Sequence, residues 1–125
     1  MHLGRDDGDL AGARAALGAG QLLGVSCYGD LDAAAAAAAA GADYLAFGSV
    51  FASPTKPQAP RIALELLAEA RQRFGLPVAA IGGINLDNAP EAIAAGADLL
   101  AVISDLFDTM NISARARDYE NCFLR

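Results

Sequence analysis

The segment from Phe47 to Pro60 carries the residues with the clearest chemical potential. It reads Phe-Gly-Ser-Val-Phe-Ala-Ser-Pro-Thr-Lys-Pro-Gln-Ala-Pro, with a proline on each side of the pair Thr55-Lys56. Proline stiffens the backbone, so a rigid loop would present Ser53, Thr55 and Lys56. Their hydroxyl groups and the single ammonium group can bind a phosphate through hydrogen bonds and charge. An ordinary surface loop is the alternative for this composition.

A Gly-Gly turn and the end of a later apolar run form a second candidate group. The turn, Ile81-Gly-Gly-Ile-Asn85, lies where a strand-like run gives way to a helix-like segment. Glycines let the backbone approach a ligand, and N–H groups at a helix start favour an anion; a tight turn without a ligand is the alternative. In a (β/α)8 barrel, Gly83 and the pair Ile103-Ser104 would follow strands 7 and 8. The loops after those strands form the recurrent phosphate site of such barrels.

Asp7 and Ser26 are further candidates, each at the end of a strand-like run. A carboxylate there can hold Mg²⁺ and leave coordination positions for substrate phosphates, although Asp residues are also common at helix starts for dipole reasons. Ser26 could donate a hydrogen bond to a phosphate. The adjacent Cys27 has no neighbouring histidine to activate it, which argues against a nucleophilic thiol. The single histidine, His2, is predicted to have a structural role.

The elements that must position these residues are predicted from apolar runs and helix caps. Near-continuous apolar runs are typical of strands covered on both faces, as in parallel sheets. Helix-like segments alternate with them, beginning after Asp or Asn residues and ending at glycines. The predicted strands are 22–26, 44–47, 78–81 and 99–103, after a strand remnant at 1–4, and the predicted helices are 9–17, 31–40, 62–74, 88–95 and about 114–123.

One segment occurs twice and indicates how these units are arranged. Residues 40–49 (AGADYLAFGS) return, slightly changed, as residues 95–104 (AGADLLAVIS). In a parallel sheet the carboxyl ends of strands meet at one edge, so the serines that end the two copies should share a rim. Asp43 and Asp98 lie at the opposite end of each strand and are predicted to cap structure. The pattern fits an open doubly wound sheet or part of a (β/α)8 barrel, and a complete barrel needs roughly 200 residues or more.

Composition excludes several classes of function. The chain has 125 residues and a net charge of −6, and its basic residues are scattered singly, which argues against a nucleic-acid partner. No apolar run approaches the roughly 20 residues of a membrane span, so no membrane association is predicted. The two cysteines are far apart and lack the spacing of a metal site, which predicts reduced thiols and a cytoplasmic location. Small-molecule phosphates are the expected ligands.

Taken together, these motifs resemble the thiamine phosphate synthase family. The resemblance covers essentially the whole chain and corresponds to the C-terminal part of that family. It rests on segments in the family's order: His2-Leu-Gly-Arg-Asp-Asp7, Gly24-Val-Ser26, Gly41-Ala-Asp-Tyr44, Thr55-Lys56, Ile81-Gly-Gly-Ile84 and Val102-Ile-Ser104. Arg5 replaces the family's usual Gln, and Ala52-Ser53 replaces the usual Pro-Thr. The implied fold is the C-terminal half of a (β/α)8 barrel, with about four parallel βα units in a single domain over residues 1–125.

The resemblance also implies roles for the candidate residues. Asp7 would be one of two Mg²⁺ ligands, and Ser26 and Lys56 would act catalytically on the pyrophosphate of hydroxymethylpyrimidine diphosphate. Ser53 and Thr55 would line the same loop. A separate group, Gly83, Ile103 and Ser104, would bind thiazole phosphate. The implied reaction joins the two substrates to give thiamine phosphate and pyrophosphate.

Two alternatives to a synthase remain open at this point. One is the related thiazole tautomerase-like branch, and the other is a non-catalytic phosphate-binding or assembly module. The family's N-terminal part supplies pyrimidine diphosphate contacts and a second Mg²⁺ ligand that this sequence does not contain. We therefore expect little or no synthase activity from this chain alone. An open half-barrel also predicts self-association or pairing with another chain through exposed strand edges.

Overall fold

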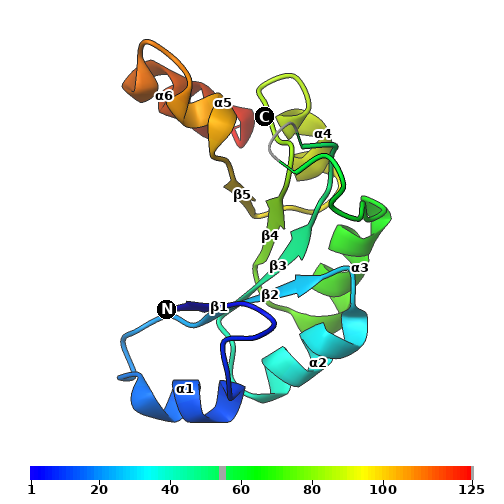
Figure 1. The fold of residues 1–125 in the computed structure, drawn as a ribbon, viewed down its shortest axis with the longest axis vertical. Coiled ribbons are helices and arrows are strands. Elements are labelled where there is room, and N and C mark those ends of the chain that lie inside the picture. Colours follow the sequence, from blue (N-terminus) through cyan, green and yellow to red (C-terminus); the bar gives the residue numbers. More distant parts are fainter. Residues whose placement is uncertain (54–55, 125) are drawn as a thin grey trace.

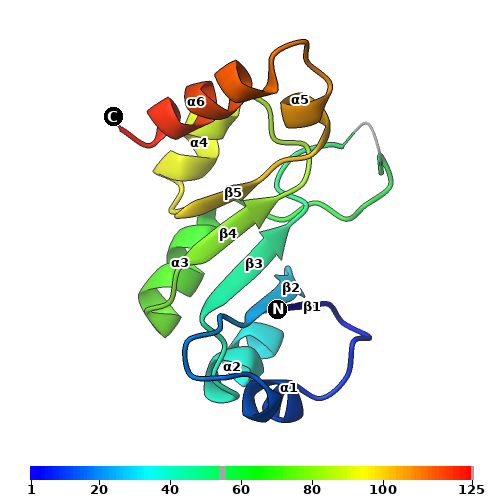
Figure 2. The ribbon, with the colours of Figure 1, turned by 90° about the vertical axis from the view of Figure 1, so that its left-hand side faces the viewer.

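The computed structural model describes residues 1–53 and 56–124. Within these residues, five parallel strands form one sheet, in the order in which they occur along the chain. Every neighbouring pair of strands is parallel. The strands are β1 (His2–Leu3), β2 (Gly24–Tyr28), β3 (Tyr44–Gly48), β4 (Val78–Ile81) and β5 (Leu99–Ala101). All five carboxyl ends therefore lie at the same edge of the sheet (Figure 2).

Helices connect the strands, as expected for βα units. They are α1 (Leu10–Ala16), α2 (Leu31–Ala39), α3 (Glu65–Phe74), α4 (Ala89–Ala94), α5 (Ser104–Phe107) and α6 (Ile112–Cys122). The Asp30 carboxylate caps α2 by accepting hydrogen bonds from the N–H groups of Asp32 and Ala33. No helix in the described ranges has the length and apolar character needed to cross a bilayer.

The predicted strands and helices are present, with bounds that differ by a few residues. Strand β2 covers Gly24–Tyr28 rather than 22–26, and the last helix begins at Ile112 rather than about residue 114. The short helix α5 is not among the predicted helices. The third helix begins at Glu65 rather than residue 62, and β5 ends at Ala101. The interpretation that the strands are covered on both faces is wrong for the described part of the chain. In Figure 1, α2, α3 and α4 lie along one side of the sheet while the opposite side is open. On the sheet, Ile81 is 41% exposed and Leu99 is 45% exposed.

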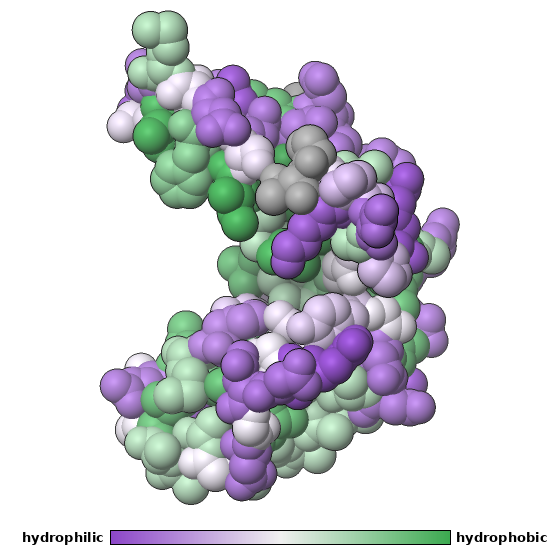
Figure 3. Space-filling model, viewed as in Figure 1, coloured by the Kyte–Doolittle hydropathy of each residue, from purple (hydrophilic) through white to green (hydrophobic). Residues whose placement is uncertain are grey.

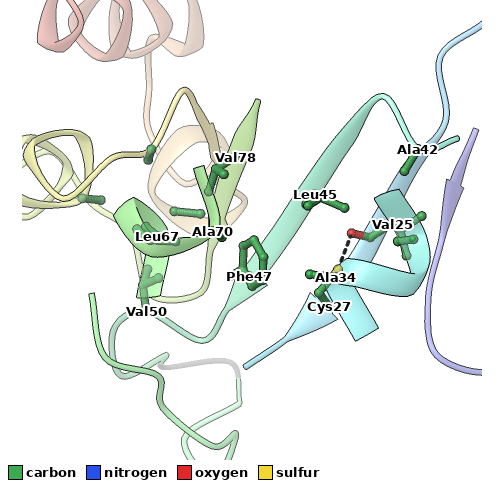
Figure 4. Packing of buried hydrophobic residues seen from close by; sticks show 14 of the residues in the cluster. Val25, Cys27, Ala34, Ala42, Leu45, Phe47, Val50, Leu67, Ala70 and Val78 are labelled. Atoms are coloured by element: carbon green, nitrogen blue, oxygen red, sulfur yellow. Dashed lines mark hydrogen bonds between the residues drawn. The ribbon is translucent and has the colours of Figure 1, made fainter. Parts of the chain in front are cut away.

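The hydrophobic core lies between the sheet and helices α2, α3 and α4. Alternate residues of β2, among them Val25 and Cys27, point towards the helices and are buried together with Leu45 and Phe47 of β3 (Figure 4). The helices contribute small residues such as Ala34, so backbones can pack closely against the strands. Burial, followed by the nearby Asp30 charge, raises the pKa of the Cys27 thiol to about 11, which makes this thiol unreactive at neutral pH.

Asp43 and Asp98 connect neighbouring strands at their amino ends, in the structural role predicted for them. The N–H of Asp43 donates to the Leu23 carbonyl at 2.7 Å, and the Leu23 N–H donates back to the Asp43 carboxylate at 2.7 Å. Asp98 repeats this exchange with Val78, at 2.8 and 3.0 Å. An arginine pairs with each carboxylate, Arg14 with Asp43 and Arg71 with Asp98. These reciprocal bonds fix the register of adjacent strands.

The Asp43 carboxylate should make the stability of the fold depend on pH in the acid range. The Leu23 N–H and the Arg14 guanidinium hold the pKa of the Asp43 carboxyl below its usual value. A carboxyl with a lowered folded-state pKa stabilises the fold above its unfolded pKa of about 3.9, and that contribution is lost as the pH falls through the folded pKa.

We therefore expect Asp43→Asn to lower the melting temperature at neutral pH and to flatten its fall in acid. Thermal unfolding followed by circular dichroism, from about pH 7 to below pH 3, measures both effects. The exposed Asp118→Asn on α6 is the charge-matched control and should change neither. A constant difference between Asp43→Asn and the unsubstituted chain across this range would contradict the assignment.

Candidate functional site

A cavity of about 1110 Å³ opens at the carboxyl edge of the sheet. Its lining includes a residue at or just beyond the end of each strand: Arg5, Tyr28, Gly48, Ile81 and Ala101. Figure 3 shows the molecule hollowed beside the open face of the sheet, with hydrophobic atoms along part of the hollow. A cavity at this edge matches the usual position of ligand sites in parallel α/β folds.

Most of the predicted site residues meet in this cavity. The lining includes Ser26, Ser53, Lys56, Gly83, Ile103 and Ser104. The cavity therefore brings together residues that lie up to 78 positions apart in sequence. They come from β2, from the loop after β3, from the turn after β4 and from the segment after β5. Thr55 lies outside the described residues, and Asp7 lies outside the cavity lining.

The loop that carries Ser53 and Lys56 closes on itself at its base. The Ser49 N–H donates to the Pro60 carbonyl at 3.2 Å, and the Ile62 N–H donates to the Ser49 carbonyl at 3.0 Å. Further along, the Lys56 N–H donates to the Ser53 hydroxyl at 3.3 Å. Hydrogen bonds at the base thus hold this loop beside the cavity, in addition to the stiffening expected from its prolines.

The Gly-Gly turn after β4 packs directly against this loop. The N–H of Phe51 donates to the Gly82 carbonyl at 3.1 Å. Gly82 and Gly83 have φ angles of 106° and 65°, in the region that favours glycine. A Cβ atom at Gly83 would collide with the backbone carbonyl of Ala52, and one at Gly82 would collide with the Ser49 side chain. Glycine is therefore required here by backbone conformation and by close approach to the loop.

Two asparagines fix the end of the same turn, a role that the sequence analysis missed. The Asn85 N–H donates to the Asn88 side chain at 2.8 Å, and the Asn88 N–H donates to the Asn85 side chain at 2.9 Å. The Asn88 amide also donates to the Gly83 carbonyl at 3.0 Å. The spacing Asn-x-x-Asn before α4 resembles a capping box and could have indicated this exchange.

Gly83→Ala should destabilise the fold more than Gly75→Ala does. Both glycines have nearly the same φ, 65° and 66°, but nothing lies within 4 Å of a Cβ at Gly75. Gly75→Ala should therefore cost only the left-handed conformation, about 1 kcal/mol, whereas Gly83→Ala adds a clash with the loop, for about 2–4 kcal/mol in total. Urea unfolding measures both losses. Equal losses would show that the loop does not pack tightly on the turn.

Asp105, directly after Ser104, is partly exposed and is paired with two side chains of α6. Its carboxylate lies 2.8 Å from the Arg115 guanidinium of α6 and accepts a hydrogen bond from the Tyr119 hydroxyl. Burial opposes ionisation of Asp105, but the hydrogen bonds from Tyr119 and Arg115 outweigh it and hold the pKa of this carboxyl below its usual value. Helix α6 thereby holds the segment that carries Ser104.

Tyr119→Phe should lower the free energy of unfolding by about 1 kcal/mol, because it removes one hydrogen bond to a charged group and keeps the ring. Urea unfolding at neutral pH measures this loss. Tyr119 is only 8% exposed, so the phenylalanine ring occupies the same packed position. If Tyr119→Phe and the unsubstituted chain have the same free energy of unfolding, the Tyr119–Asp105 hydrogen bond does not hold α6 against α5.

The cavity contains cationic groups that suit an anion. Lys56, the only lysine of the chain, and Arg61 lie on the lining and are exposed. Arg5 also lines the cavity, with its guanidinium 4.3 Å from the centre of the Tyr28 ring. The negative charge of Asp105 is offset by Arg115. These cations can attract a phosphate into the cavity.

Asp7 is the residue that the sequence predicts as a magnesium ligand. Asp7 is exposed in the segment after β1, and its Oδ2 accepts a hydrogen bond from the Gly4 N–H at 2.7 Å. Among residues 1–53 and 56–124, no group of three or more His, Cys, Asp or Glu side chains is placed to hold a metal. Mg²⁺ often uses one or two carboxylates with substrate phosphates, so Asp7 could supply one of these ligands.

The sequence matches a known family along most of its length. A family model described as thiamine monophosphate synthase matches residues 1–106. The thiamine-phosphate synthase of Aromatoleum aromaticum is 58% identical over 123 residues, which are 98% of this chain and 59% of that protein. The thiamine-phosphate synthase of an Azoarcus species is 60% identical over 98% of this chain and 60% of its own length. The chain thus spans about three-fifths of these relatives.

Solved structures share the same arrangement of strands and helices. A thiamine phosphate pyrophosphorylase from Pyrococcus furiosus superposes with a TM-score of 0.84 at 34% identity, over 98% of this chain and 58% of that one. A 3-hexulose-6-phosphate synthase superposes with a TM-score of 0.70 at 22% identity, which shows similarity of fold alone.

Proposed function

The chain belongs to the thiamine monophosphate synthase family, and from this membership we propose that its cavity binds the phosphorylated substrates of thiamine phosphate synthesis. The observation that carries the proposal is the convergence of Ser26, Ser53, Lys56, Gly83, Ile103 and Ser104 on one cavity at the carboxyl edge of the sheet. In the proposed transferase reaction, hydroxymethylpyrimidine diphosphate and thiazole phosphate give thiamine phosphate and pyrophosphate.

Ser26 and Lys56 are proposed to act on the diphosphate. The bond between the pyrimidine methylene carbon and the diphosphate oxygen breaks, and the electron pair leaves with pyrophosphate. The thiazole nitrogen then donates its lone pair to that carbon and forms the new C–N bond. The Lys56 ammonium offsets the charge that develops on the leaving group, the Ser26 hydroxyl donates a hydrogen bond to it, and Ser53 lines the same loop. Thr55 is proposed to contribute a further hydroxyl there.

The second phosphate is proposed to lie at the other side of the cavity. Gly83, Ile103 and Ser104 follow β4 and β5, where backbone N–H groups and the Ser104 hydroxyl can donate to the phosphate of the thiazole. The turn that carries Gly83 is fixed by Asn88, and the segment that carries Ser104 is held by α6. Preformed donors of this kind bind an anion with little reorganisation.

Magnesium is proposed as the cofactor, with Asp7 as one ligand. When bound, the ion would offset charge on the diphosphate and help it to leave. The exposed Asp7 and the family membership support this assignment.

The fold is proposed to be the C-terminal half of a (β/α)8 barrel, in one domain. Strands β1 and β5 each have one strand neighbour within the described sheet, and the face opposite α2, α3 and α4 is open. Further βα units like those of the longer relatives, or a second copy of this chain, would pair with these edges. No nucleic-acid or membrane partner is proposed, and the location is proposed to be cytoplasmic.

Lys56→Ala should weaken binding of inorganic pyrophosphate by about tenfold or more, because a charge-assisted contact contributes roughly 1.5–3 kcal/mol. Isothermal titration calorimetry measures the dissociation constant. Arg73→Ala removes the same charge from α3, outside the cavity lining, and is the matched control. If both substitutions raise the dissociation constant equally, Lys56 acts only through the overall charge of the chain and not through a direct contact with the anion.

Thiamine phosphate formation tests the activity itself. Because the chain corresponds to about three-fifths of each relative, we expect little or no product from this chain alone. Co-expression with the unmatched part of the Aromatoleum aromaticum relative should restore product, measured by chromatography. Thiazole isomerisation by the chain would instead favour the tautomerase-like alternative. Phosphate binding with no product, both from the chain alone and from the co-expressed pair, would favour a binding module.

A further inference from the structure

Three polar side chains meet on the open face of the sheet. His2 of β1 lies level with Gly24 of β2, and Gly24 lies level with Tyr44 of β3. The His2 and Tyr44 rings stack with their centres 5.6 Å apart. This is possible because Gly24 has no side chain: a Cβ there would collide with the Tyr44 ring. Ser26, two residues after Gly24 along β2, lies closer to the carboxyl edge and lines the cavity.

His2 connects the other two side chains by hydrogen bonds. Its Nδ1 lies 2.8 Å from the Tyr44 hydroxyl, and its Nε2 lies 2.7 Å from the Ser26 hydroxyl. Within residues 1–53 and 56–124, His2 is the hydrogen-bond partner that the structure gives to each of these hydroxyls. A neutral imidazole donates a hydrogen bond from one ring nitrogen and accepts one at the other. If Nδ1 accepts from Tyr44, Nε2 must therefore donate to Ser26, and the reverse also holds.

We propose that His2 is a positioning residue whose Nε2–H holds the Ser26 oxygen and thereby turns the Ser26 hydrogen towards an anion in the cavity. A phenol is a better donor than acceptor, so the Tyr44 O–H donates to Nδ1. The proton of the neutral ring is then on Nε2, which donates to Ser26. The Ser26 hydrogen, left unused by His2, faces the cavity.

The opposite arrangement would make Ser26 unsuitable for a phosphate. If Nδ1 carried the proton, Nε2 would accept the Ser26 O–H, and Ser26 would present only oxygen lone pairs to the cavity. Lone pairs repel a phosphate oxygen, whereas a hydroxyl hydrogen binds it. The tautomer of His2 therefore decides whether Ser26 attracts or repels the anion. This inference rests on the proposed binding of a diphosphate at Ser26.

The tautomer can be measured without any ligand. His2 is the only histidine, so a chain labelled with ¹⁵N-histidine gives a single pair of ring-nitrogen signals. For the neutral ring, the proposal predicts the Nε2–H tautomer. Tyr44→Phe should shift the ring towards a mixture of tautomers, while Tyr119→Phe, at the opposite end of the sheet, should leave the signals unchanged. A predominant Nδ1–H tautomer in the unsubstituted chain would overturn the proposal.

A double-mutant cycle tests whether His2 acts through Ser26. The dissociation constant for inorganic pyrophosphate should rise about tenfold in Ser26→Ala and about five- to tenfold in His2→Ala. Adding His2→Ala to Ser26→Ala should cause no further loss, because the hydroxyl that His2 orients is gone. His2→Gln places an amide N–H near the position of Nε2–H and should recover affinity to within about twofold of the unsubstituted chain.

The outcomes separate this inference from the proposed function. Additive losses from the two alanine substitutions, or no recovery in a folded His2→Gln chain, would show that His2 does not act through Ser26. Absence of pyrophosphate binding in the unsubstituted chain would instead contradict the proposed diphosphate site. In that case the ring-nitrogen signals still decide whether Ser26 is oriented as proposed.

Discussion

Parallel pairing of five strands in chain order is the constraint on which the rest of the structure depends. Because every strand runs in the same direction, every strand ends at the same edge, and the loops that follow must meet there. The reciprocal bonds of Asp43 with Leu23 and of Asp98 with Val78 fix the register at the opposite edge. Register at the amino ends thus determines which side chains reach the cavity at the carboxyl ends.

The loops at that edge are held by contacts with one another. The Gly-Gly turn supports the loop that carries Ser53 and Lys56, Asn88 fixes the turn, and α6 holds the segment after β5 through Asp105. Each of these contacts leaves hydroxyl groups, backbone or cations on the cavity lining. Catalysis of group transfer depends on positioning and charge stabilisation, so a cavity built in this way suits the proposed chemistry.

Much of the fold and of the candidate site could be predicted from the sequence. The repeat at 40–49 and 95–104, with apolar runs between helix-like segments, is a local pattern, and local patterns indicate strands, helices and the rim at which strands end. The same reasoning predicted that Ser26, Lys56, Gly83 and Ser104 lie near this rim, because each is in the last part of a strand or in the segment that follows one.

What the sequence could not predict depends on contacts between distant residues. The ion pair between Asp105 and Arg115 requires α6 to pack beside α5, and the open face of the sheet depends on which helices cover it. Likewise, the contact between His2 and Tyr44 requires three strands in register and a glycine between them. No local pattern in the chain encodes these arrangements.

The most direct test of the central claim is to map anion binding residue by residue. Backbone amide shifts followed by NMR during titration with inorganic pyrophosphate should move at the carboxyl ends of the strands, around Ser26, Lys56, Gly83 and Ser104. The amides of Asp43 and Asp98, at the opposite edge, should stay fixed. Shifts centred on the amino edge, or spread evenly over the surface, would contradict the account.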